Sequence, residues 1–162
     1  MEATLLLAQA VATGLIALWL TLGLKDNFLH PSVNEKYTAE VLAMTRMRAQ
    51  YPEEFKAVAH RAITNRQTQQ FAFRCVLVAE FVTCILLWLG VLGLLIGIRN
   101  PDAFEAGRII AMLGALSFTT IWAGFLIVGN HFCYWFCHEG AQNTHFQMTL
   151  WGLATLILIG QS

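Results

Sequence analysis

Two long stretches of the chain contain no charged side chain, and this feature limits its fold more than any other. No Asp, Glu, Lys or Arg occurs between Phe81 and Ile98 or between Ile109 and Gly129. An α-helix needs about 20 apolar residues to cross the roughly 30 Å hydrocarbon core of a bilayer. Only 12% of the 162 residues are charged, whereas soluble domains average about 25%. We therefore expect an integral membrane protein.

Four apolar segments are predicted to cross the membrane as helices. They lack the alternation of apolar and polar residues that is typical of an outer-membrane β-barrel. The first segment has no basic residue ahead of it and no convincing cleavage site, so we interpret it as a helix rather than a signal peptide. The expected fold is all-α, a four-transmembrane-helix bundle. It forms a single membrane domain over residues 1–162, with spans at about 4–24, 71–98, 106–128 and 145–159.

Residues 25–70 connect the first two spans and form the only sizeable polar segment. "HPSVNEKY" contains Pro31 and Asn34 and is predicted to be a turn. "TAEVLAMTRMR" and "PEEFKAVAHRA" place apolar residues at roughly helical spacing, and Pro52 suits the first position of a helix. We expect two short amphipathic helices that lie on the membrane surface or fold over the bundle.

Basic residues concentrate at one end of the predicted bundle. Eight of the ten Lys and Arg residues lie between Lys25 and Arg74, and only Arg99 and Arg108 lie elsewhere. Because cytoplasmic loops of membrane proteins are enriched in Lys and Arg, this pattern places the connector in the cytoplasm and both termini outside. The expected location is the cell (inner) membrane. The formal net charge of zero gives no reason to expect a nucleic-acid partner.

The segment "GNHFCYWFCHEGAQNTHF", residues 129–146, is a candidate metal or haem site. It contains three histidines and two cysteines, which are good ligands for zinc, copper and haem iron. His131, His138 and His145 recur every seven residues. On one straight helix, neighbours in this series would lie about 10 Å apart. That separation is too large for two of them to share an ion.

A turn at Glu139–Asn143 would reverse the chain and could bring His131, Cys133 and His145 together. Those three residues are the expected ligands if a metal is bound. The two cysteines lie four residues apart, which matches no common ligand pair. The aromatic residues among positions 132–136 are instead typical of the membrane–water boundary. We therefore expect an aromatic hairpin at headgroup depth, with no bound metal or other cofactor.

Glu80 is an ionisable residue expected inside the second span. Counted from Phe71, nine residues of helix place it about 14 Å deep, near the midplane. Such a residue is either functional, as a proton relay or a ligand contact, or makes a structural hydrogen bond. The third span offers hydroxyl donors and Trp122 as partners. Glu80 and Trp122 are therefore the intramembrane functional candidates, and no catalytic residue is predicted.

Gly93 and Gly97 form a pair of small residues four positions apart in the second span. Such pairs let the backbones of two membrane helices approach closely. The pattern predicts a close helix contact on this face of the span.

Several short features follow one another along nearly the whole chain. They are Asp26, Asn27 and Asn34; Val41, Leu42 and Met44; Arg61, Ala62 and Ile63; Glu80; Trp122 and Phe125; and a hairpin from Gly129 to Phe146 containing Gln142. In this order they resemble the prokaryotic small integral membrane proteins grouped as domain of unknown function 2165. The resemblance implies four spans and a bacterial membrane, and it implies no known activity. The hairpin departs from the Glu-Trp-Phe pattern of many members.

Two classes of function remain. The sequence has no nucleophile–base pair, carboxylate pair, phosphate-binding loop or zinc-protease helix, so we expect no enzymatic activity. The favoured function is a non-catalytic accessory subunit of a larger bacterial membrane complex, such as a respiratory or other redox assembly. Its partners would be the lipid bilayer and other membrane subunits. The alternative is a membrane-embedded redox or metal/haem-binding protein that uses the hairpin. A transporter using Glu80 is less favoured, because no repeat or broken-helix pair is present.

Overall fold

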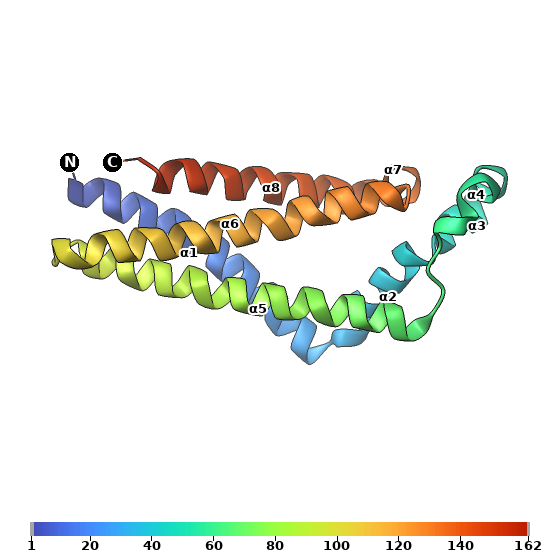
Figure 1. Cartoon of the computed structure of the whole chain (residues 1–162), viewed down its shortest axis with the longest axis horizontal. Coiled ribbons are helices and arrows are strands. Elements are labelled where there is room, and N and C mark those ends of the chain that lie inside the picture. The colour runs from blue at the N-terminus through green and yellow to red at the C-terminus, as the bar shows by residue number, and fades with distance from the viewer. Residues whose placement is uncertain (1, 162) are drawn as a thin grey trace.

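A computed structural model describes residues 2–161, which are almost entirely helical (Figure 1). In chain order the helices are α1 (Glu2–Leu29), α2 (Pro31–Leu42), α3 (Thr45–Gln50), α4 (Pro52–Val58), the short 3-10 helix η1 (Ala59–Arg61), α5 (Arg66–Gly97), α6 (Pro101–His131), α7 (Tyr134–Cys137) and α8 (Glu139–Ile159). Helices are expected in lipid because they satisfy every backbone hydrogen bond within one segment.

Three helices are long and apolar enough to cross a membrane, over Ala3–Leu29, Arg66–Gly97 and Ala103–His131. Each extends beyond its predicted span, because flanking polar and charged residues remain helical outside the apolar region. A fourth long helix, α8, contains the predicted span at 145–159 but begins at Glu139. Its first turns are polar, with the sequence "EGAQNTH".

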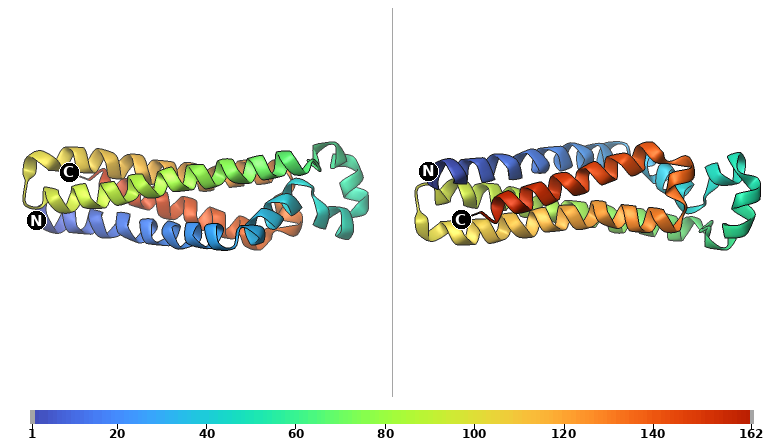
Figure 2. Two further views of the ribbon diagram at one scale, coloured as in Figure 1. Left: turned by 90° about the horizontal axis from the view of Figure 1, so that it is seen from below. Right: turned by 90° about the horizontal axis from the view of Figure 1, so that it is seen from above.

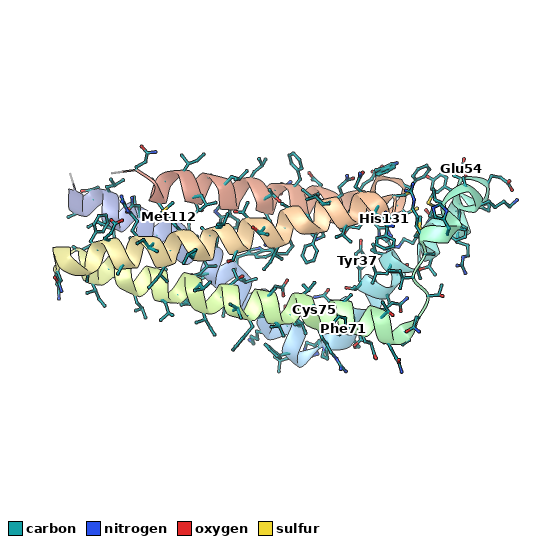
Figure 3. All side chains as sticks on the ribbon, viewed as in Figure 1. Tyr37, Glu54, Phe71, Cys75, Met112 and His131 are labelled. Atoms are coloured by element: carbon teal, nitrogen blue, oxygen red, sulfur yellow. The ribbon has the colours of Figure 1, made fainter. Side chains whose placement is uncertain are left out.

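The four long helices lie side by side, as all three views in Figures 1 and 2 show. The N-terminal end of α1, the C-terminal end of α8 and the turn between α5 and α6 lie at one end of the bundle. The segment from α2 to η1 lies at the opposite end, together with α7. This segment, residues 31–61, is called the connector below.

Glycines allow α5 and α6 to pack backbone against backbone. A Cβ atom built on Gly93 would lie 2.5 Å from the Cα of Gly107, and one built on Gly97 would lie 3.0 Å from the Cα of Phe104. Such a contact is possible only without a side chain on α5, so the predicted close approach at Gly93 and Gly97 is confirmed. The two helices diverge toward the connector end (Figure 1).

The main core lies between the four long helices. Ile16, Leu87, Phe118 and Ile159, one from each of α1, α5, α6 and α8, are fully buried. Burial of such a side chain stabilises packing of the helices through close van der Waals contact rather than by removal from water, since the lipid outside is equally apolar.

Gln9 adds a polar link to this core. The side chain is fully buried in α1, and its Nε2 donates to the carbonyl oxygens of Leu158, Ile159 and Gln161 at 3.1, 3.3 and 3.0 Å. Carbonyls in the last turn of a helix have no partner within that helix. The amide of Gln9 therefore satisfies part of the C-terminal end of α8 and holds it against α1.

The connector differs from its prediction in one place. The expected turn at "HPSVNEKY" is wrong, because α2 begins at Pro31 and continues through Asn34. Proline is well suited to the first position of a helix, where its missing N–H needs no partner. The chain breaks later, at Met44, which has a positive φ of 52°. This break separates α2 from α3 and divides the first of the two predicted amphipathic helices.

A second, smaller apolar core holds the connector against the end of the bundle. It consists of Leu42, Met44 and Met47 from the connector and Phe132 and Cys133 from the turn after α6, and it is called the connector core below. All five residues are buried. The connector therefore folds over the bundle end, which is one of the two placements that the sequence allowed.

Candidate functional site

Glu80 lies on α5 and is buried, with 6% of its surface exposed. Its Oε2 accepts a hydrogen bond from Nδ2 of Asn27 at 3.3 Å, and Oδ1 of Asn27 accepts one from Asn34. These three side chains form a polar row from α5 through the end of α1 to α2. The expected partner on the third span is wrong, because α1 rather than α6 supplies the donor.

The surroundings of Glu80 place it near the connector-side boundary of the apolar region, shallower than the midplane position expected. Asn27 stands two residues from the end of α1, next to the exposed charges of Lys25 and Asp26. On α5, the exposed Arg74 precedes Glu80 by six residues, a rise of about 9 Å. These flanking charges favour a depth shallower than the midplane, because the first turns of α5 are polar.

Trp122, the other intramembrane candidate, is the centre of an aromatic cluster that joins three helices. Its ring centroid lies 5.0 Å from Trp19 of α1, 5.3 Å from Phe125 of α6 and 5.2 Å from His145 of α8. The side chain is 7% exposed. Its Nε1 is buried and finds no hydrogen-bond acceptor in the part of the chain whose side chains are described. The cluster thus contains an unused donor, which the sequence did not predict.

A row of alternating tyrosine and histidine rings connects this cluster to the connector. Tyr134 stacks between His138 and His145, with centroid distances of 5.4 and 5.7 Å and interplanar angles of 27° and 19°. The Tyr134 hydroxyl lies 3.4 Å from Nδ1 of His145. At the connector end, the hydroxyl of Tyr37 lies 3.0 Å from Nδ1 of His138. The row therefore joins α2 to the hairpin and the hairpin to α8.

Burial, more than the surrounding charges, favours the neutral forms of His138 and Tyr134. Burial lowers the pKa of His138, and the Arg46 guanidinium lowers it further, while Glu40 opposes this effect. Burial raises the pKa of Tyr134. Arg46 itself is held by Glu40 through two contacts, Nε to Oε1 at 2.9 Å and Nη2 to Oε2 at 3.1 Å. Neutral imidazole and phenol groups suit hydrogen bonding and stacking.

The structure does not bring the three possible metal ligands together. His131 is exposed and packs against Phe132, whereas the buried Cys133 lies beside Arg61. His145 lies in the ring row beside Tyr134. Among the side chains that the structure describes, those of residues 3–100 and 103–161, no group of three or more His, Cys, Asp or Glu is placed to hold a metal ion.

The turn that reverses the chain lies before the predicted one. Helix α6 ends at His131, and the chain turns at Cys133, which has a positive φ of 55°, before the short α7. The predicted turn at Glu139–Asn143 is wrong, because those residues form the first turn and more of α8. The aromatic side chains also divide: Phe132 and Tyr134 are buried, whereas Trp135 is 44% exposed. Only part of the expected aromatic belt therefore faces outward.

Arg61 makes a contact between the connector and the end of α6 that the sequence did not predict. Its Nη1 donates to the carbonyl oxygen of His131 at 3.2 Å and lies 3.8 Å from Sγ of Cys133. A cation at the C-terminal end of a helix is stabilised by the unsatisfied carbonyls and the helix dipole. Arg61 thus caps α6 from the connector. No spacing signal could have revealed this pair, because its members lie 70 residues apart in the chain.

The sequence as a whole matches one family model. That family is described as "Predicted small integral membrane protein (DUF2165)", and the match covers residues 5–162. The chain belongs to this family. With three candidate spans, this family member is an integral, multi-pass membrane protein. Comparisons with the curated proteins and with the solved structures find no match.

Proposed function

We propose that this chain is a non-catalytic accessory subunit of a larger bacterial membrane complex, such as a respiratory or other redox assembly. The observation that carries the proposal is the use of its buried polar side chains. Gln9 binds the end of α8, and Glu80 is bonded to Asn27 of α1. These side chains form hydrogen bonds between helices of the same chain, which is typical of a structural role.

The outward faces of the long helices support the same proposal. Large apolar side chains are exposed on all four, including Leu22, Phe81, Leu116 and Leu153. In a membrane such faces contact lipid or the helices of another subunit. The close glycine contact between α5 and α6 makes the scaffold rigid, since backbones that touch cannot slide easily past each other.

We further infer that α8 is a fourth membrane span. Its 21 residues give a length of about 31 Å, close to the thickness of a hydrocarbon core. It lies alongside α6 from the connector end toward the end that holds the N-terminus (Figure 1). The hydrogen bonds from Gln9, in the apolar part of α1, to the C-terminal end of α8 support this inference. The ring of His145, in the second turn of α8, packs against Tyr134 and Trp122.

Native purification in a mild detergent tests the proposed function. We expect the chain to elute in a stoichiometric complex with larger membrane subunits that mass spectrometry identifies. The same sample gives an absorption spectrum and a metal analysis. A chain that elutes alone and shows a Soret band, or carries a bound metal in proportion, would overturn the proposal in favour of a metal or haem protein using the hairpin at residues 129–146.

A further inference from the structure

A groove on the outer surface of the bundle runs between α1 and α5. It has a volume of about 430 Å³ and is open toward the outside of the bundle. Its lining includes Thr21, Lys25 and Phe28 from α1 and Phe81, Cys84 and Trp88 from α5. From this groove we propose that the chain binds an anionic phospholipid, with an acyl chain between the two helices and the phosphate at Lys25.

The floor of the groove suits an acyl chain because its polar atoms are already paired. Nε1 of Trp88 donates to Oγ1 of Thr21 at 3.0 Å, and that hydroxyl donates to the carbonyl of Ala17 at 2.7 Å. Sγ of Cys84 also lies 3.3 Å from Oγ1 of Thr21. With these groups satisfied within the protein, the surface offered to a ligand is apolar. A polar ligand group would find no free partner there.

The charge at one end of the groove identifies the headgroup. Lys25 is the first charged residue after the apolar run of α1, it is exposed, and it lines the groove. A lysine at this position extends its ammonium to the membrane surface along its apolar stem. None of the ion pairs among the described side chains (residues 3–100 and 103–161) involves Lys25. Its charge is therefore available to a phosphate.

A second cation favours an anionic lipid over a zwitterionic one. Arg74 is exposed and precedes Phe81 by seven residues, or about two turns, which places it on the groove side of α5 above Lys25. The rings of Phe28 and Phe81, which line the groove on the connector side of Lys25, meet edge to face with centroids 6.4 Å apart. The groove thus has one cation, Lys25, in its lining and a second, Arg74, toward the connector.

Quenching of Trp88 fluorescence by lipids with brominated acyl chains tests this inference. The protein is reconstituted in phosphatidylcholine vesicles that contain an equal fraction of brominated phosphatidylglycerol or brominated phosphatidylcholine. The fluorescence of Trp88 is obtained as the difference between the emission of the wild type and that of Trp88→Phe. We expect the brominated phosphatidylglycerol to quench Trp88 at about a fivefold lower mole fraction. This factor corresponds to about 1 kcal/mol for one basic residue at a membrane surface.

Lys25→Ala should abolish this preference, whereas Arg99→Ala, which removes an exposed cation at the other end of α5, should preserve it. Equal quenching by both lipids in the wild type, or an undiminished preference in Lys25→Ala, would overturn the inference. A photoreactive residue at position 85, which lines the groove, identifies the occupant in native membranes. A phospholipid adduct supports the inference, and an adduct to another polypeptide or to a second copy of this chain contradicts it.

Discussion

Gly93 and Gly107 meet across the α5–α6 interface so closely that a Cβ on Gly93 would lie 2.5 Å from the Cα of Gly107. Gly93→Ala should therefore force the two backbones apart and lower the free energy of unfolding by about 1–3 kcal/mol, as overpacking does in other cores. Thermal unfolding in detergent measures the loss. Gly124→Ala is the matched control, because a Cβ there has nothing within 4 Å. Equal stability of the two variants would mean that the contact is not present in the membrane protein.

Substitution of Glu80 separates a structural role from an ionisable one. Glu80→Gln keeps an oxygen that can accept from Asn27, so we expect stability close to that of the wild type. Glu80→Leu leaves the buried amide of Asn27 without this acceptor and should cost about 1–3 kcal/mol. Glu54→Leu, an exposed change in the connector, controls for the loss of a charge. If Glu80→Gln were as damaging as Glu80→Leu, an ionisable carboxyl would be required.

Low pH should weaken the packing of the connector against the end of the bundle, called docking below. Burial lowers the pKa of His138 from 6.5 in the folded chain, so below that pH the state with the connector undocked binds more protons, at His138, than the docked state. Docking is then fully stable above about pH 6.5 and weakens as the pH falls through the lowered pKa. Protonation also turns Nδ1 into a donor, so the Tyr37 hydroxyl could no longer donate to it.

Hydrogen exchange of residues 31–61, corrected for the intrinsic effect of pH, measures this docking at about pH 7.5 and about pH 5.5. His138→Gln should remove the pH dependence, whereas the exposed His60→Gln should retain it. A connector that exchanges equally at both values in the wild type would show that His138 does not control docking.

The hairpin at residues 129–146 is expected to bind no transition metal. His131, Cys133 and His145 contact different neighbours and do not converge, and Cys133 lies against Arg61. Elemental analysis of the purified protein should therefore give far less than one zinc, copper or iron per chain. A stoichiometric metal that disappears in His131→Ala or His145→Ala would contradict this expectation.

The hydropathy of the chain was sufficient to predict its long helices, because membrane crossing depends on residue type and length alone. The glycine spacing at Gly93 and Gly97 likewise revealed a close helix contact. The partner of Glu80 could not be predicted in this way. Both α1 and α6 offer suitable donors, and the choice of Asn27 depends on which helix lies beside α5 at that height.

The turns were harder to predict than the helices. Gly140 favoured a reversal at Glu139–Asn143, yet the chain reverses at Cys133 in a left-handed conformation that side chains rarely adopt. The connector core explains this choice, because it buries Cys133 and Phe132 against Met44. Contacts between distant segments thus overrode the local preference for glycine. The contact of Arg61 with the end of α6 could not be predicted for the same reason, because its two residues are distant in sequence.

The bond between Gln9 and the end of α8 sets an order of events during synthesis. Gln9 enters the membrane with the first helix, whereas its acceptors at Leu158, Ile159 and Gln161 are made about 150 residues later. Until then its amide lies in lipid without these partners, at a cost of several kcal/mol. The nascent chain therefore carries an amide nitrogen whose three acceptors arrive only with its last helix. A chain that stops before α8 leaves this nitrogen without them.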